Sequence, residues 1–152
     1  MFTPNNMRQW LAICKKDIAE INFVQAIIDD SQMTNDISQR KYTDNLLLYG
    51  VLPDYGADTR TEDALMMRSG FDFLILKKAQ RSNQTMDMLL DDMEETLQGT
   101  QKLLARVVEE MRNPQSCEMF YYLEENSLQI VPVWGKAGTN GYMMSLNLRS
   151  PQ

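Results

Sequence analysis

Residues 85–112, TMDMLLDDMEETLQGTQKLLARVVEEMR, form the longest uninterrupted helical pattern in the sequence. Most of the charged residues fall on one side of this pattern, which is typical of a helix that lies with one face on an apolar surface. A helix of this length spans roughly 40 Å, enough to cross a whole sheet. The stripe that we expect to be buried consists of Met86, Leu90, Met93, Leu97, Leu104, Val107, Val108 and Met111.

The ends of this helix carry clear signals. Asn83 or Thr85 is suited to cap the first free N–H groups, and Asn113-Pro114 is a stop signal. Gly99 lies in the interior, where it predicts a close approach to the sheet or a slight bend.

A first helix is predicted at residues 4–20. Thr3-Pro4 is a helix-start signal, because threonine caps and proline is tolerated at the first helical position. Cys14 belongs to the apolar stripe and is interpreted as a small buried hydrophobe rather than a reactive nucleophile. The stripe consists of Met7, Trp10, Leu11, Cys14, Ile18 and Ile21.

The region between the two helices is predicted to hold three strands. Residues 22–28 either end the first helix or form a short strand, which we favour. Residues 29–45 are polar and predict a long surface connection with one helical turn near residues 36–42. Residues 46–52 form a strand that ends at Pro53-Asp54, and residues 64–78 form a central strand that is buried on both faces. These last two strands are predicted to pair as a long antiparallel hairpin through residues 53–63.

Three further strands are predicted after the long helix, at residues 118–123, 128–134 and 142–148. Residues 135–141 contain Gly135, Gly138 and Gly141 and are interpreted as a flexible hairpin loop rather than a nucleotide site. Pro132 lacks a backbone donor, so its strand should lie at an edge or beside a bulge. The fold class predicted is α+β: a mainly antiparallel sheet of about four to six strands packed against the long helix and the N-terminal helix, in one domain covering residues 1–152.

The composition limits the partners. The net charge of -6 and the dispersed Lys and Arg residues disfavour nucleic acid. No apolar run approaches the length needed to span a bilayer, and we expect a cytoplasmic protein that binds no membrane. Cys14 and Cys117 lie far apart without metal-ligand spacing, so both are expected to be reduced.

The sequence carries no catalytic signature. Histidine is absent, which removes the commonest general base and nitrogen metal ligand. Asp91, Asp92, Glu94 and Glu95 are the densest carboxylate group and could hold a divalent cation, but a solvated helix face is the better interpretation. We therefore predict no catalytic residue, no cofactor and no metal site, and a protein that is not an enzyme; an enzyme using carboxylates alone is the least favoured class.

Apolar side chains on strand-like segments are candidates for a contact surface. Phe120 to Tyr122 and the pairs Met66-Met67 and Met143-Met144 suit adaptable interfaces, although half of each alternating run should be core. If helices cover only one face of the sheet, Met143 and Tyr122 would leave an apolar strip that needs a partner.

The order of elements resembles the tail-terminator proteins of long-tailed phages and contractile injection machines. The resemblance covers nearly the whole chain as architecture: the first helix, the pair LLLYGVLPDYGADTRTEDALMMRSGFDFLILKK, the long helix, and the MFYYL and YMMSLNL strands. It implies a structural subunit that forms a homohexameric ring and caps a tail tube. The implied partners are the tube and the sheath or neck proteins, with assembly in the cytoplasm and a final place in a virion or injection particle. The alternative is a small acidic immunity or inhibitor protein that blocks a toxin's basic site, which net charge alone supports.

Overall fold

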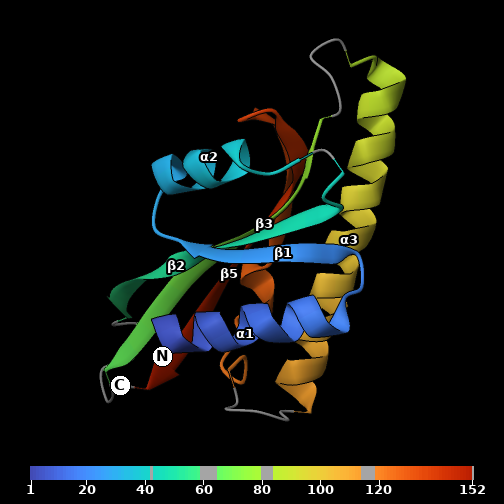
Figure 1. The fold of residues 1–152 in the computed structure, drawn as a ribbon. Coiled ribbons are helices and arrows are strands. Elements are labelled where there is room, and N and C mark those ends of the chain that lie inside the picture. Colours follow the sequence, from blue (N-terminus) through green and yellow to red (C-terminus); the bar gives the residue numbers. More distant parts are fainter. Residues whose placement is uncertain (42, 59–64, 80–83, 114–118, 152) are drawn as a thin grey trace.

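The computed structural model describes residues 1–41, 43–58, 65–79, 84–113 and 119–151 (Figure 1). The chain has an α+β fold, as predicted, with one five-stranded sheet in the order β1-β2-β3-β5-β4. The elements in chain order are α1 (Pro4–Asp17), β1 (Ile21–Ile27), α2 (Asp30–Ser38), β2 (Leu46–Asp58), β3 (Met66–Lys78), α3 (Met86–Arg112), the short 3-10 helix η1 (Glu125–Ser127), β4 (Gln129–Lys136) and β5 (Thr139–Pro151).

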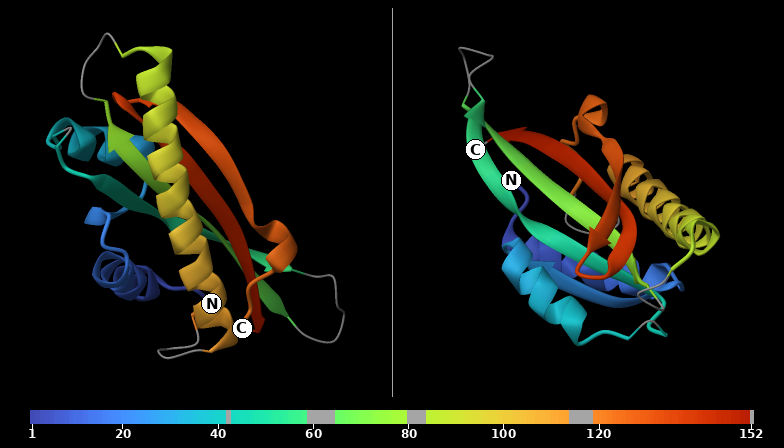
Figure 2. Two further views of the ribbon diagram at one scale, coloured as in Figure 1. Left: turned by 90° about the vertical axis from the view of Figure 1, so that its right-hand side faces the viewer. Right: turned by 90° about the horizontal axis from the view of Figure 1, so that it is seen from above.

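The sheet is mostly antiparallel. Strands β2, β3, β5 and β4 pair with antiparallel neighbours, whereas β1 runs parallel to β2. A parallel pair needs a crossover connection, which α2 supplies between β1 and β2. Helices α1 and α3 pack on one face of the sheet, α1 over β1 and β2 and α3 over β5 and β3, while α2 packs on the opposite face (Figures 1 and 2).

Helix α1 starts where predicted but ends earlier. The Thr3 hydroxyl accepts a hydrogen bond from Asn6 N at 3.1 Å, and the Asn6 side chain accepts one from Thr3 N at 2.9 Å. The predicted end at residue 20 is wrong because Ile18 is already extended, with φ −112°. The apolar periodicity misled because Ile18 and Ile21 are both buried although they lie beyond the helix.

Helix α2 corrects the prediction of a polar connection at residues 29–45. The helix begins at Asp30, well before the single turn expected at residues 36–42, and Asp29 caps it by accepting from Gln32 N at 3.0 Å. Met33 and Ile37, four residues apart, are fully buried against the second face of the sheet. Tyr49 donates a 2.6 Å hydrogen bond to Asp36 and so fastens the helix to β2. Residue 42 lies outside the described residues.

The long hairpin of β2 and β3 is confirmed, but β2 does not end at Pro53. Pairing continues to Asp58 opposite Met66, and the register shifts between Val51 and Asp54. That irregularity accommodates Pro53, which has no N–H to donate to the ladder. The central position of β3 is also confirmed: Phe71, Phe73 and Ile75 join one core, and Leu74 and Leu76 join the other.

Helix α3 has the predicted length and ends, but the predicted buried stripe is wrong. Thr85 caps the helix by accepting from Met88 N at 3.2 Å, and Asn113 ends it. Met86 and Leu90 are 66% and 57% exposed, and of the predicted stripe only Val107 is fully buried. At 3.6 residues per turn, the true buried face is rotated by about a quarter turn from the predicted one. It consists of Thr96, Gly99, Thr100, Leu103, Val107 and Glu110.

Gly99 sets the position of α3, as its place in the sequence predicted. A Cβ atom at Gly99 would lie 2.5 Å from Cδ1 of Leu46, so with any larger residue the end of the Leu46 side chain would have to shift. Thr96 and Thr100 flank the contact, and their hydroxyls donate to the carbonyls of Asp92 at 3.0 Å and Thr96 at 2.8 Å. The two threonines are therefore buried without leaving a polar group unpaired.

The segment after α3 contains two strands rather than three. Residues 119–123 form a turn whose β-pairing with the sheet is one isolated bridge, between Leu123 and Leu148. Met119, Phe120 and Leu123 are buried, so the segment does not alternate as a strand would. Residue 118 lies outside the described residues. Strands β4 and β5 are confirmed with longer bounds, and Pro132 lies in the edge strand β4.

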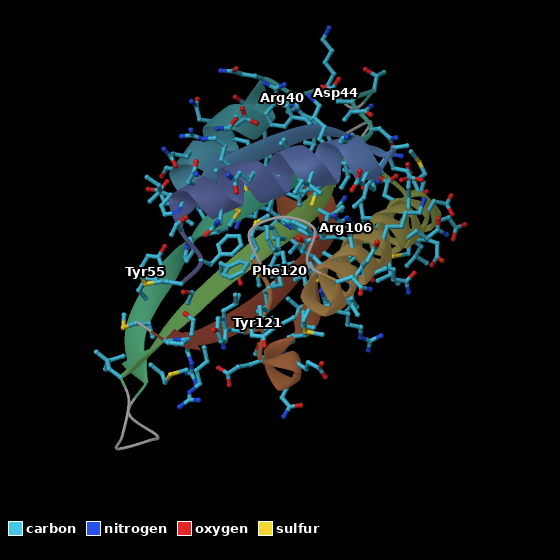
Figure 3. The ribbon with its side chains drawn as sticks, turned by 90° about the horizontal axis from the view of Figure 1, so that it is seen from below. Arg40, Asp44, Tyr55, Arg106, Phe120 and Tyr121 are labelled. Carbon is cyan, nitrogen blue, oxygen red and sulfur yellow. The ribbon has the colours of Figure 1, made fainter. Side chains whose placement is uncertain are left out.

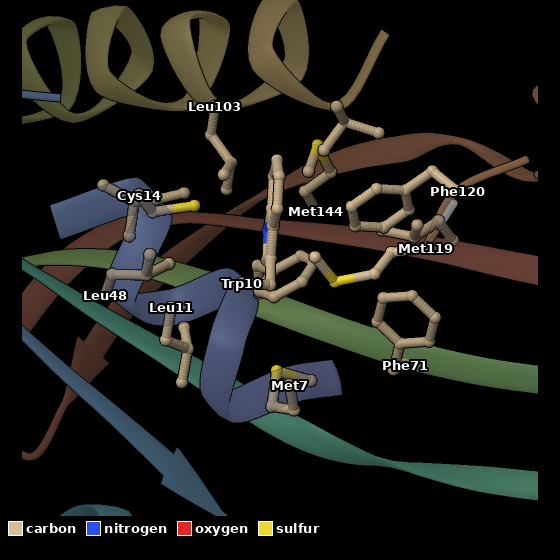
Figure 4. Packing of buried hydrophobic residues seen from close by; sticks show 14 of the residues in the cluster. Met7, Trp10, Leu11, Cys14, Leu48, Phe71, Leu103, Met119, Phe120 and Met144 are labelled. Atoms are coloured by element: carbon tan, nitrogen blue, oxygen red, sulfur yellow. The ribbon is translucent and has the colours of Figure 1, made fainter. Parts of the chain in front are cut away.

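The main core lies between the sheet and α1 and α3. Its centre is aromatic: the rings of Phe2 and Phe71 stack with centroids 4.4 Å apart, and Trp10 meets Phe120 edge-on at 4.6 Å (Figure 4). A smaller core lies under α2. The side chains of β5 alternate, and Met144, Leu146 and Leu148 enter the main core.

The rotated face of α3 can be tested by truncation. Leu103 is fully buried, so Leu103→Ala should lower the free energy of unfolding by about 2 to 5 kcal/mol. Leu97 is half-buried, so Leu97→Ala should lower the free energy of unfolding clearly less than Leu103→Ala does. Glu94 is exposed, and Glu94→Ala should change this free energy by less than about 0.5 kcal/mol. Urea denaturation of the three variants decides the matter. An equal loss at Leu97 and Leu103 would contradict the observed orientation of the helix.

Candidate interaction surfaces

An apolar groove lies between the start of α3 and the β4–β5 hairpin; we call it the β4–α3 groove. It encloses a cavity of about 400 Å³ lined by Met86, Leu89 and Trp134 together with polar residues of the hairpin. Trp134 is 77% exposed, the highest value among the exposed large apolar side chains. Exposed apolar side chains gathered at one place are typical of a surface that binds a partner.

Local geometry holds the groove open. Asn140 is almost fully buried; its side-chain oxygen accepts from Gly135 N at 2.9 Å, and its amide nitrogen donates to Gln84 at 3.2 Å. The hairpin turn carries positive φ angles at Ala137 (51°) and Gly138 (78°), as tight hairpin turns require. These contacts fix the end of β4, and hence Trp134, beside the first turn of α3.

The side of α3 that faces away from the sheet is acidic. Asp87, Asp91 and Glu94 are exposed, and none of them forms an ion pair with another described residue. The predicted carboxylate group does not converge as a metal site would, because Asp92 and Glu95 turn to the other side and contact Lys77. Within the described ranges, no group of three or more metal-ligating side chains is assembled.

The outer side of α1 is basic. Arg8, Lys15 and Lys16 are exposed and have no ion-pair partner in the described part of the chain. At about 100° per residue, Arg8 and Lys15 lie roughly half a turn from Asp17. Asp17 accepts a 3.0 Å hydrogen bond from Arg106 of α3. Arg8 and Lys15 therefore face away from α3, towards the β1 edge of the sheet.

Charged contacts join α1 to α3 on the inner side. Arg106 donates to Asp17 and to the fully buried Glu110, both at 3.0 Å, and its guanidinium lies 5.6 Å from the centre of the Trp10 ring. Burial acts to lower the pKa of Arg106, but the two carboxylate hydrogen bonds outweigh it and hold that pKa above its usual value. Lys102 also pairs with Glu20 across a neighbouring shallow cleft. This network holds two helices together and offers no group positioned for catalysis.

An aromatic pair is exposed at the other end of the sheet. Tyr121 and Tyr122 are 58% and 42% exposed, and their rings meet edge-on at 5.0 Å (Figure 3). Of the side chains proposed as contact surface, Phe120 and Met144 are core, while Met66, Met67 and Met143 are half-buried. The expectation of an apolar strip beside Met143 changes, because α2 covers part of that face and Met143 packs against its cluster.

Trp134 and the basic side of α1 were not singled out from the sequence. In the sequence, Trp134 follows apolar strand residues and would be interpreted as a core residue. Its exposure becomes evident only when its strand is placed at the edge of the sheet. Arg8, Lys15 and Lys16 did carry a signal, because they fall on the polar side of the predicted first helix.

Cys14 has the character of a core residue, as predicted. It is fully buried with a free thiol, and burial raises the pKa of that thiol far above its usual value. The thiolate, which is the nucleophile, is therefore scarce at neutral pH. Cys117 lies outside the described residues.

Alkylation tests the burial of Cys14. Iodoacetamide at about pH 8 should modify Cys14 in the folded protein at least roughly a hundredfold more slowly than in the urea-unfolded chain, because the folded thiol is both shielded and protonated. Peptide mass spectrometry separates Cys14 from Cys117. Equal rates in the two states would show that Cys14 is accessible.

Among the described residues no helix is both long and apolar enough to cross a bilayer. A scan against protein-family models finds no match to this chain, and a search of curated proteins finds no similar sequence.

Proposed function

We propose that this chain is a structural protein, a tail-terminator-like subunit that forms a closed ring on the end of a phage-type tail tube or contractile injection apparatus. The observation that carries the proposal is the exposed end of the β2–β3 hairpin at one corner of the sheet, which we call the arm and where β2 continues to Asp58 opposite Met66. Residues 54–57 of this arm are exposed, and Leu65 at the start of its return is 49% exposed. Figure 1 shows the arm leaving the body beside the chain ends. An extended arm suits contact with a neighbouring subunit or with a tube.

The element order also supports the proposal. The N-terminal helix, the long hairpin, the long helix and the terminal β4–β5 hairpin follow one another as in the architecture that the sequence resembles. The additional helix α2 and the turn at residues 119–123 are departures from the predicted arrangement, and both leave the sheet order and the arm intact.

The surfaces suit a ring. The β4–α3 groove lies on the β4 side of the molecule and the basic side of α1 on the β1 side, so the two candidate surfaces differ and face opposite ways. Contacts between unlike surfaces are heterologous, and they close into a ring when the rotation between neighbours permits. In this proposal the chain acts through contacts with its own copies and with the tube and the sheath or neck proteins.

Imaging of the native particle tests the function. Electron microscopy of particles carrying this chain with an epitope tag should place it at one end of the tube, as a closed ring of six copies. Its absence from the tube end, or its presence there in any other form than a ring, would contradict the proposal.

The arm can be tested in the same preparation. Ala57→Asp with Leu65→Asp places charge on exposed arm positions, so the fold should persist while incorporation at the tube end falls. Asn126→Asp, also exposed but outside the arm, is the control and should be incorporated normally. Normal incorporation of the arm variant would assign the tube contact to another surface.

A second candidate is the acidic inhibitor, favoured by the exposed carboxylates of Asp87, Asp91 and Glu94, which form no ion pair with any residue that the structure describes. An inhibitor would bind one basic toxin as a single copy through this side of α3. A stable one-to-one complex with a toxin, and no chain at any tube end, would favour it.

A further inference from the structure

We propose that the outer edge of β1 binds an extended acidic segment of a partner protein, which adds to the sheet as a sixth strand. The inference goes beyond the proposed ring and does not depend on it, because this binding can be measured on the isolated chain.

The first step is that β1 offers backbone groups for pairing. The strand pairs with β2 on one side and is the last strand of the sheet on the other. Outside that pairing, the backbone groups of residues 22–26 have no backbone partner in the described part of the chain. The Gln25 side chain donates to the Ala26 carbonyl at 3.2 Å, a local contact that an added strand can replace. Figure 1 shows β1 at the near edge of the sheet, between α2 and α1.

The second step is that the sequence of β1 favours such pairing. Its residues, INFVQAI, carry no charge and include neither proline nor glycine. Isoleucine, phenylalanine and valine are types that favour strands. Ile28, directly after the strand, is 66% exposed and adds apolar surface at the end of this edge. An uncharged edge strand of this kind is suited to pair with another chain.

The opposite edge of the sheet is protected. Pro132 of β4 has no N–H to offer a further strand, and Lys136 places a charge in the same strand. The pairing of β4 with β5 shifts after Val133, and Gly135 has a positive φ of 68°. Proline, lysine and an irregular register are the features by which proteins prevent edge pairing. Of the two edges, β1 is therefore the one that can accept a strand.

The third step is that cations flank the β1 edge on both faces of the sheet. Arg8 and Lys15 lie on the side of α1 turned towards this edge, exposed and without an ion-pair partner in the described part of the chain. On the other face, the Arg40 guanidinium lies 4.0 Å from the centre of the Phe23 ring. An added strand would lie about 4.8 Å beyond β1, between these cations. Carboxylates on that strand would be complementary to them.

The carboxylates of the segments around β1 are already engaged within the chain. Asp29 and Asp44 accept hydrogen bonds from backbone N–H groups at 3.0 and 2.9 Å. Asp36 accepts from Tyr49 at 2.6 Å, and Glu20 pairs with a lysine of α3. The cations of α1 at this edge thus remain for an acidic partner.

The fourth step excludes a second copy of β1 as the occupant. Two copies of β1 paired antiparallel about a two-fold axis would place both copies of α1 on the same face of the joined sheet. Arg8 and Lys15 of one copy would then oppose those of the other, which disfavours the pairing. The occupant that fits both the backbone and the charges is an acidic strand from another protein.

Peptide binding tests the inference. The probe is a capped peptide of alternating glutamate and valine, seven residues long to match β1, and its control is the same peptide with lysine for glutamate. Calorimetric titration at about 150 mM salt limits the effect of the net charge of -6, because charges then act over only about 8 Å. The glutamate peptide should bind with a dissociation constant below about 1 mM, and the lysine peptide at least about tenfold more weakly.

Two readouts locate the bound strand. Hydrogen exchange at the amides of residues 22–26 should slow when the glutamate peptide binds. Two further peptides carry N-methyl groups on the valines or on the glutamates. Because alternate N–H groups of an added strand face β1, one of these peptides should lose at least about tenfold in affinity while the other keeps it.

A matched pair of variants tests the charges. Lys15→Glu should raise the dissociation constant of the glutamate peptide at least about threefold, and Arg8→Glu with Lys15→Glu at least about tenfold. Arg112→Glu is the control and should change it less than about twofold. Like Lys15, Arg112 is an exposed cation in the last turn of its helix, but it belongs to α3.

The inference is overturned if the glutamate peptide does not bind up to about 1 mM, if the lysine peptide binds equally well, or if protection appears along β4. Equal affinities of the two methylated peptides would show that the backbone of β1 is not paired. A dimer that forms through β1 without peptide, measured by sedimentation, would assign the edge to a second copy instead. None of these results bears on whether the chain caps a tube, which imaging decides separately.

Discussion

The closest approach between α3 and the sheet, at Gly99, determines how the rest of the molecule presents itself. A side chain at this position would collide with Leu46, so the helix rests on its smallest residues and the sheet comes near its backbone. Thr96 and Thr100 complete this contact because their hydroxyls bond to carbonyls within the helix. Once that face is against the sheet, Met86 lies beside Trp134 of β4 and Leu90 is exposed, so neither enters the core. The groove beside Trp134 is thus a consequence of how the helix is seated.

The fold class, the long helix and its caps, the β2–β3 hairpin and the edge position of Pro132 follow from the sequence, because each depends on local signals of period or turn chemistry. The buried face of α3 could not be predicted in this way, because a search for apolar periodicity does not count threonine or glycine as buried positions. Helix α2 was missed for a similar reason: only Met33 and Ile37 mark its buried side, and its remaining residues are polar. Residues 119–123 include types that favour strands, but the segment forms a turn. The turn allows Met119, Phe120 and Leu123 to be buried on the same side.

The candidate surfaces could be predicted only in part. The acidic side of α3 and the basic side of α1 are both visible as charge patterns on predicted helices, but a charged helix side is usually just solvated. The strand order places the two helices over different strands, α1 over β1 and β2 and α3 over β5 and β3, and this separation is not visible in the sequence. That order depends on the pairing of β3 with β5, which joins residues far apart in the sequence, such as Met66 and Pro151. The exposure of Trp134 depends on the same order.

A net charge of -6 would by itself make copies of this chain repel one another. Repulsion between whole molecules acts over about 10 Å at ordinary ionic strength, whereas docked surfaces respond mainly to the charges that face each other. In the described part of the chain, exposed carboxylates without an ion-pair partner lie on α3 and exposed cations without one lie on α1, so the two kinds of charge are separated on different helices. Such a distribution opposes pairing of like surfaces and favours a head-to-tail order, in which every contact joins opposite charges. In the proposed ring, the net charge would oppose uncontrolled aggregation, while the separation of charges would favour contacts between unlike surfaces of neighbouring copies.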